Sequence, residues 1–395
     1  MLDKPIQIGS MEIKNRLVKA AVVENMATET GEVSESMIEL YQRVARGGAG
    51  LIITGGAYVQ PNGRNVKFQT GVHHDGLIPT LSKLAKAGQE DGAKIVLQIS
   101  HGGRQCNPEL VGGEVVGPSP VKDSMTKITP RMLSAKEIDE IIDAFRLASG
   151  RVQAAGFDGV EIMAGHGYLI NGFLSRRTNR RKDEWGGLLE NRARFLFTII
   201  EKVRDIVGPD YPILVKLNTE DQMKNGLTLK ESAWIASRLQ DLGINAIKFT
   251  GGTYESALNI ARGDIPEDEI LENYQGWERI RLKLIIRALR KKFKFSEAYF
   301  LENVKKVRCG LQIPVILVGG LRTPAVMESI LRNGHSDMIA LGRPLIREPH
   351  FARKILSGDE SSSSCTSCNR CFIRVSQEMP VRCYRGPDQT VKAKI

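Results

Sequence analysis

Short apolar runs alternate with longer amphipathic stretches along most of this chain. The apolar runs are rich in Val, Ile and Leu and show little alternation with polar residues, which is typical of strands that are covered on both faces of a sheet. Eight of these runs are predicted as strands: Leu17–Val22, Gly50–Thr54, Lys94–Ile99, Gly159–Met163, Ile213–Leu217, Ala246–Thr250, Pro314–Val318 and Met338–Leu341.

The stretches between the strands carry the periodicity and the end signals of helices. Ser134 followed three residues later by Glu137 is a capping box, and Gly208 and Gly243 each follow the last residues of a periodic stretch. The clearest predicted helices are Ser36–Gly47, Ala135–Ala155, Leu189–Val207, Leu229–Leu242 and Pro324–Asn333.

Eight alternating strand and helix units predict a (β/α)8 barrel, an α/β fold that we expect to cover residues 1–358. The segment Ile6–Ile13 is predicted to form a hairpin that plugs the bottom of the barrel, and residues 359–395 a short cysteine-bearing tail. A doubly wound sheet is the alternative architecture. No Gly-x-Gly-x-x-Gly motif follows the first strand, however, which makes that alternative weaker.

Composition narrows the class of protein. The chain has 395 residues, of which 42% are hydrophobic and 6% aromatic, as in a globular protein with a substantial core. No run approaches the roughly 18 apolar residues of a membrane-spanning helix, and the N-terminus lacks the apolar segment of a signal peptide. We therefore expect a cytoplasmic protein without membrane contact, in a compartment where disulfides are rare.

The net charge of +11 comes largely from two basic segments. One is Arg176–Lys182; the other, Arg279–Arg308, carries eleven Lys or Arg against two Glu. The second begins with a predicted helix, residues 277–295, whose apolar side chains are expected to be buried. No nucleic-acid module is recognisable, so no nucleic acid is expected as a partner. A solvated basic face is the simpler interpretation, and an anionic substrate or acidic partner protein the alternative. The apolar positions are Leu282, Ile285, Ile286 and Leu289.

Glycine-bearing loops follow the seventh and eighth predicted strands, where α/β barrels often bind phosphate. Gly319 and Gly320 allow backbone N–H groups to approach an anion closely, next to the helix that opens at Thr323. Gly342 and Arg343 form a second such turn with a permanent positive charge. Tight connections without a ligand are the alternative, but two such turns at adjacent strand ends favour a phosphate site.

Two further strand ends carry polar side chains suited to a flat heterocycle. Lys216 ends the fifth predicted strand and could neutralise negative charge, while Gln98 ends the third and offers both a donor and an acceptor. The loop after the fourth strand holds His166 and Tyr168, at the end of a barrel strand where catalytic groups of such folds are found.

The motifs NRLVKAAV, LQISHGGRQ, GHGYLINGFLS, TNRRKDEWGG, LVGGLRT and LGRPLIREP together resemble the old yellow enzyme family of FMN-dependent ene reductases. The resemblance runs from about Ile6 to Leu356. It implies that FMN is the cofactor, that NAD(P)H reduces it, and that the flavin is held by Ala20, Ala21, Val22, Gly56, Gln98, Lys216, Gly319, Gly320, Gly342 and Arg343.

The resemblance also assigns catalytic roles. Tyr168 stands at the position of the family's proton donor, and a phenol with a pKa of about 10 is protonated at neutral pH. Met163 replaces the first residue of the usual substrate-gripping pair and resembles the 2,4-dienoyl-CoA reductase branch, so His166 alone is left to orient or polarise the substrate. That branch has an assisting histidine after the sixth strand, where this chain has Tyr254 and Glu255.

Two residues are predicted to contact the substrate. Tyr254 is one, because of its place after the sixth strand, although His166 could equally take over the assisting role there. Arg176 is the other, because it could meet an anionic substrate tail or the phosphates of the nicotinamide donor. Simple solvation of Arg176 at the surface is the alternative.

Four of the six cysteines lie in the last 31 residues with the spacing of metal ligands. The dienoyl-CoA reductase branch carries a [4Fe–4S] cluster at this place, with three residues between its second and third cysteines where this chain has two. A cluster is therefore predicted, with zinc or an empty site as alternatives. The predicted ligands are Cys365, Cys368, Cys371 and Cys383.

The predicted function is transfer of hydride from reduced FMN to an activated C=C bond of a small-molecule unsaturated carbonyl, enoate or thioester. The alternatives are an FMN-dependent amine dehydrogenase or demethylase, and a flavoprotein electron carrier that docks a redox partner. We expect the chain to lack the second flavin domain of the dienoyl-CoA reductase branch. Electrons would then come from NAD(P)H or an external donor. A homo-oligomer is a further possibility.

Overall fold

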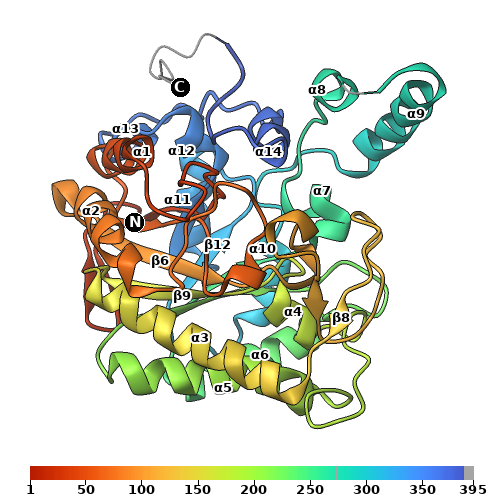
Figure 1. Cartoon of the computed structure of the whole chain (residues 1–395). Helices are drawn as coiled ribbons and strands as arrows, with labels where there is room; N and C mark the ends of the chain where they lie inside the picture. The colour runs from red at the N-terminus through yellow and green to blue at the C-terminus, as the bar shows by residue number, and fades with distance from the viewer. Residues whose placement is uncertain (273, 387–395) are drawn as a thin grey trace.

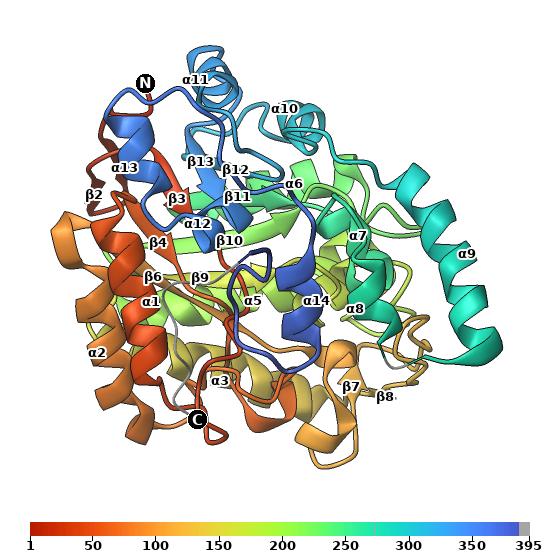
Figure 2. The same cartoon turned by 90° about the horizontal axis from the view of Figure 1, so that it is seen from above.

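The computed structural model describes residues 1–272 and 274–386, and its centre is a closed barrel of eight parallel strands (Figures 1 and 2). The strands follow one another around the barrel in chain order, and the ring closes because β3 pairs with β13. The predicted (β/α)8 barrel is therefore confirmed. Its strands are β3 (Leu17–Lys19), β4 (Leu51–Ile53), β6 (Lys94–Ser100), β9 (Gly159–Ala164), β10 (Ile213–Asn218), β11 (Ala246–Thr250), β12 (Val315–Val318) and β13 (Met338–Leu341).

The helices between the strands form an outer layer around this barrel (Figure 2). Capping fixes where several of them begin: Ser34 caps α1, and Ser134 and Thr228 form complete capping boxes at α3 and α6. The barrel helices are α1 (Glu35–Arg46), α2 (Ile78–Gly88), α3 (Ala135–Ala154), α4 (Leu169–Leu174), α5 (Leu189–Val207), α6 (Leu229–Asp241), α10 (Leu301–Val307), α11 (Pro324–Arg332), α12 (Arg343–Arg347) and α13 (Phe351–Leu356).

The predicted N-terminal hairpin is present and fills the barrel bottom. Strands β1 (Ile6–Ile8) and β2 (Met11–Ile13) pair antiparallel. Ile8, Met11 and Ile13 are almost fully buried and form one apolar cluster with inward residues from the barrel strands. The catalytic end is thus the opposite one, at the carboxyl ends of the strands. The remaining short strands are β5 (Ala57–Tyr58), which extends the sheet beside β6, and the pair β7 (Val116–Gly117) and β8 (Arg131–Met132).

An excursion after β11 projects from the barrel body (Figure 1). It contains α7 (Ala257–Ile260), α8 (Glu267–Leu271) and α9 (Gly276–Lys292). Ile286 of α9 is buried and packs with Leu282 and Leu289 in a small cluster separate from the main core. Ile285 was predicted to be buried as well, and this is wrong: it is 42% exposed. The reason is that this cluster covers only a narrow face of the helix.

The described part of the cysteine-bearing tail, residues 359–386, folds back over the barrel opening, where α14 (Arg370–Ser376) crosses the view in Figure 2. Asn369 donates to the carbonyls of Ala261 and Asp264, and Val381 N donates to the carbonyl of Glu24 at 2.7 Å. The tail is therefore anchored to loops on two sides of the opening. Among the described helices, none combines the length and the hydropathy that crossing a bilayer requires.

Candidate active site

A cavity of about 820 Å³ opens at the carboxyl ends of the barrel strands. Every residue that the sequence predicted for flavin binding lines this one cavity, as do His166, Tyr168 and Tyr254. They come from all eight barrel strands or the loops that follow them, so the barrel closure is what brings them together. The predicted flavin residues there are Ala20, Ala21, Val22, Gly56, Gln98, Lys216, Gly319, Gly320, Gly342 and Arg343.

The two glycine turns leave backbone donors free for an anion. In the described part of the chain, the N–H groups of Gly319, Gly320, Gly342 and Arg343 donate to no protein acceptor. Gly320 has φ +73°, and a Cβ there would lie 2.8 Å from the ring of Tyr299. Glycine is therefore required both by the conformation and by the aromatic neighbour.

The helix that opens at Thr323 was expected to lie next to the anion site, but its first backbone N–H groups are already occupied. The N–H groups of Arg322 and Thr323, at the start of α11, both donate to Glu297 Oε1 at 2.7 Å. A carboxylate thus already caps the helix that was expected to face the phosphate. Arg343 Nη1 donates to the carbonyl of Arg262 and to Asn369 Oδ1, which ties the second glycine turn to the tail.

The floor of the cavity is polar and charged. Gln98 Nε2 donates to Glu161 Oε1 at 2.5 Å, and Lys248 Nζ lies 2.7 Å from the same oxygen. Burial and the nearby Lys248 charge lower the pKa of Lys216 to about 7, against an opposing effect of Glu161. Sequence reasoning missed Glu161 and Lys248. The available signal was a charged residue inside each of two otherwise apolar strand runs, GVEIM and AIKFT.

Tyr168 occupies the N-cap position of α4 and lines the cavity. Asn65 Nδ2 donates to that hydroxyl at 2.9 Å, and the Tyr168 hydroxyl donates to the Tyr254 hydroxyl at 3.2 Å. The pKa of Tyr168 is raised well above 10.0, chiefly by burial and then by Tyr254, while the Asn65 hydrogen bond acts in the opposite direction. The hydroxyl is therefore protonated and its proton is held in a defined direction.

Main-chain and ionic contacts hold Tyr254 in this position. Its backbone N–H donates to the carbonyl of His166 at 3.1 Å. The next residue, Glu255, forms ion pairs with Arg104 at 3.2 Å and Arg177 at 2.9 Å. The structure thus puts Tyr254, rather than His166, beside the hydroxyl of Tyr168.

His166 faces the cavity from a strained backbone position with φ +61°. The ring Nε2 of His166 lies 2.8 Å from Thr250 Oγ1, and the backbone N–H of His166 donates to Asn218 Oδ1 at 3.1 Å. Burial, together with the charges of Lys216 and Lys248, lowers its pKa well below 6.5. The imidazole is therefore neutral, and it can donate or accept a hydrogen bond but does not act as a charged acid.

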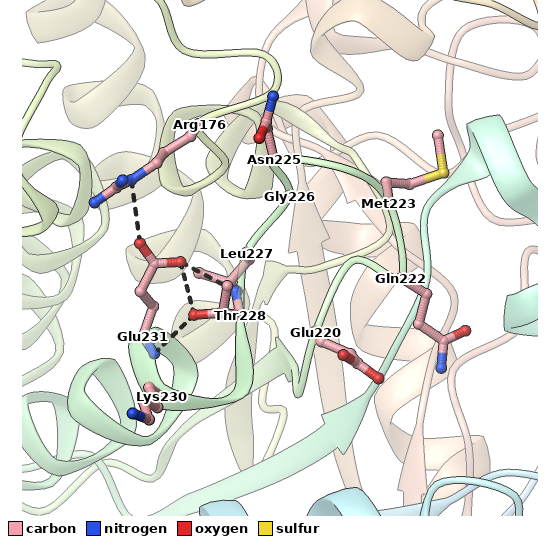
Figure 3. Close-up of a pocket in the computed structure, with 10 residues that line it drawn as sticks. All are labelled: Arg176, Glu220, Gln222, Met223, Asn225, Gly226, Leu227, Thr228, Lys230 and Glu231. Carbon is pink, nitrogen blue, oxygen red and sulfur yellow. Dashed lines mark hydrogen bonds and ion pairs between the residues drawn. The ribbon is translucent and has the colours of Figure 1, made fainter.

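Arg176 does not reach this cavity. It lines a separate groove of about 720 Å³, where it points toward Glu231 with an Nε to Oε1 distance of 3.4 Å (Figure 3). Its side chain is 64% exposed. The structure therefore brings Tyr254, but not Arg176, to the predicted active site.

The four tail cysteines are divided between the cavity wall and its surroundings. Cys365 and Cys371 line the cavity, whereas Cys368 and Cys383 do not. Within residues 1–272 and 274–386, no three His, Cys, Asp or Glu side chains are close enough to hold a single metal ion. Burial raises the pKa of Cys371 to about 12, with the other three thiols adding to the effect and Arg343 opposing it.

The donor set fits FMN. Free backbone N–H groups and Arg343 suit a phosphate, and the Gln98 amide and Lys216 ammonium suit the polar edge of a flavin ring. The model of the family described as NADH:flavin oxidoreductase / NADH oxidase matches residues 1–264 and 266–361. The chain belongs to this family. The predicted old yellow enzyme resemblance and the FMN cofactor are thereby confirmed.

Individual members of the NADH:flavin oxidoreductase family match over most of the chain. NADH oxidase of Thermoanaerobacter brockii is 38% identical over 96% of the chain and 55% of its own length. NADPH dehydrogenase of Clostridium acetobutylicum is 34% identical over 87% of the chain and 91% of its own length. A solved structure of 2-naphthoyl-CoA reductase is 31% identical with a TM-score of 0.85, covering 98% of this chain and 57% of that one. The chain therefore spans little more than half the length of some relatives.

Proposed function

We propose that this protein is an FMN-dependent NAD(P)H ene reductase that reduces the activated C=C bond of an unsaturated carbonyl, enoate or thioester. FMN, held by the residues that line this cavity, would supply the two-electron chemistry that links NAD(P)H to the alkene. The observation that carries the proposal is the Tyr168 hydroxyl, hydrogen-bonded to Asn65 and Tyr254, in the same cavity as the residues predicted to bind the flavin. Reduction of an alkene requires a proton as well as a hydride, and Tyr168 supplies the proton.

The surroundings of Tyr168 support this role. When the phenol gives up its proton, the Asn65 amide at 2.9 Å stabilises the phenolate that remains. The Tyr254 hydroxyl, at 3.2 Å, then donates a second hydrogen bond to this phenolate, and solvent returns the proton to Tyr168. Tyr254 thus acts on the proton donor in addition to contacting the substrate, and the neutral His166 orients the substrate by hydrogen bonding.

The charges around the cavity disfavour amine oxidation. Four basic side chains line it, of which Lys216 is partly ionised near pH 7, against Asp264 as a carboxylate in the same lining. A cationic amine would be repelled there, whereas an oxygen that gains negative charge during alkene reduction would be stabilised. The basic residues are Lys216, Lys248, Arg322 and Arg343.

The Tyr168→Phe variant tests the proposal in two half-reactions. Anaerobic bleaching of the flavin by NADPH should keep its wild-type rate, because this step needs no proton from Tyr168. Reoxidation by 2-cyclohexen-1-one should slow by about 10²-fold or more, the usual contribution of general acid catalysis. Wild-type reoxidation in Tyr168→Phe would refute the assigned role.

The tail cysteines, the location and the oligomeric state remain separate predictions. We propose that Cys365, Cys368, Cys371 and Cys383 bind an iron–sulfur cluster, because they have the spacing of metal ligands and the other three thiols all influence the pKa of Cys371. Iron and sulfide analysis of anaerobically purified protein tests this, with zinc or no metal as the contrary results. A cytoplasmic location and a homo-oligomer are tested by cell fractionation and by light scattering.

A further inference from the structure

Three charged residues lie side by side in the barrel interior, beneath the cavity. Glu161 is on β9, Lys216 on β10 and Lys248 on β11, and the register pairs Lys216 with Lys248. Glu161 and Lys248 have no exposed side-chain surface, and Lys216 is 6% exposed. Burying ionised groups is costly unless they are paired. A cluster of this kind in the middle of an apolar barrel therefore calls for a specific role.

The pairing within the cluster is incomplete. Lys248 Nζ and Gln98 Nε2 both contact Glu161 Oε1, while Glu161 Oε2 has no hydrogen-bond partner in the described chain. Across the same residues, Lys216 forms no ion pair. One carboxylate thus faces two ammonium groups. When all three are ionised, the cavity floor has an excess of one positive charge.

Neighbouring charges do not cancel this excess. The positive charge of Lys19, on β3, is offset by the carboxylate of Glu24, which also accepts hydrogen bonds from Tyr41 and Gly55. His166 is neutral because its pKa is lowered well below 6.5. Arg322 and Arg343 add further positive charge on the side where the glycine turns lie, rather than compensating it.

We propose that the Glu161–Lys248 pair sets the reduction potential of the flavin at this cavity, an inference that rests on the proposed function. Two-electron reduction adds negative charge to the flavin ring, and charge interactions are strong in a buried site. Lys248 stabilises the reduced flavin, and Glu161 limits that stabilisation while holding Gln98 in place. Lys248 and Glu161 are positioning residues, since Gln98 and Lys216 are the expected flavin contacts.

Charge-changing substitutions separate this role from a structural one, because they shift the potential in opposite directions. Lys248→Met removes one positive charge and should lower the potential. Glu161→Gln removes the negative charge and should raise it. The double variant restores the original net charge and should return toward the wild-type value. A structural defect would move both single variants in the same direction and the double variant further still.

The experiment is an anaerobic redox titration of the purified flavoproteins, followed by flavin absorbance against a reference dye. Each single variant should change the ratio of reduced to oxidised flavin at a fixed potential at least tenfold, which is about 30 mV for a two-electron couple. Lys248→Arg keeps the charge and should keep the potential. Equal potentials in all variants, or shifts of the same sign in both single variants, would overturn the proposal.

The test remains decisive if one variant is unusable. Should Lys248→Met fail to retain FMN, Glu161→Gln and Lys248→Arg still predict a raised and an unchanged potential. A colourless wild-type protein would contradict the proposed function itself. Coloured proteins with equal potentials would contradict only the role of the Glu161–Lys248 pair.

Discussion

At the scale of single residues, the geometry around Tyr168 depends on contacts that lie outside the catalytic loop. Glu255 is held by Arg104 and Arg177, and this places the preceding Tyr254 against Tyr168 with ring centroids 5.5 Å apart. Tyr254 could be predicted as a site residue from its position after the sixth strand. Its partner could not be predicted, because the contact joins residues 86 positions apart.

Gly320 offers a direct test of the phosphate turn. Gly320→Ala should destabilise the protein and weaken FMN binding, because it adds a Cβ at φ +73° and 2.8 Å from Tyr299. The positive φ costs about 1–2 kcal/mol and the overpacking about 1–3 kcal/mol. The matched control is Gly334→Ala, which has φ +63° and no atom within 4 Å of the added Cβ. Equal losses in melting temperature and FMN affinity for the two variants would contradict the steric argument.

Lys216 should give the flavin-free protein a characteristic pH dependence. Its pKa falls from 10.5 in the unfolded chain to about 7 in the folded one, so the unfolded chain binds more protons between these values. Stability should therefore rise with pH in this window, by up to about 1.4 kcal/mol per pH unit from this group. Urea unfolding at pH 7 and pH 9 should show this increment in the wild type and not in Lys216→Met. If the stability of the wild type and of Lys216→Met changed with pH in the same way, the contribution of Lys216 would be excluded.

At the scale of elements, the barrel strands could be predicted because burial on both faces gives continuous apolar runs. For α9, the burial of Leu282, Ile286 and Leu289 could be predicted from their helical spacing, but the exposure of Ile285 and of further apolar residues could not. Leu282, Ile286 and Leu289 pack inward, while Trp277 and Leu284 are 85% and 63% exposed. Periodicity alone does not say which of two apolar stripes a helix buries.

The small cluster under α9 should unfold separately from the barrel. Ile286→Ala removes a side chain that is 3% exposed and should increase hydrogen exchange across α8 and α9, with little change in the global melting temperature. Ile285→Ala is the matched control, because Ile285 is 42% exposed and should have little effect. A large global loss of stability in Ile286→Ala would mean that α9 belongs to the main cooperative core.

At the scale of the whole molecule, barrel closure gathers residues from all eight strands or strand ends around one cavity, and the tail crosses its opening. The convergence of the predicted flavin residues on one cavity could be anticipated from the sequence, because each stands at a strand end. The charged floor beneath them required the strand register, since Glu161 and Lys248 are 87 positions apart and meet only in the closed barrel. Arg176 shows the limit of this reasoning. It lies close in sequence to Tyr168, but the structure places it in a different groove.

The most direct test of the central claim is anaerobic absorbance spectroscopy of the purified wild-type protein. The account predicts flavin absorption bands, bleaching of these bands by NADPH or NADH, and their return on addition of 2-cyclohexen-1-one. Trimethylamine serves as the opposing substrate and should leave the oxidised bands unchanged. A flavin that is bleached by the amine, and that the enone does not reoxidise after reduction, would contradict the assignment as an ene reductase.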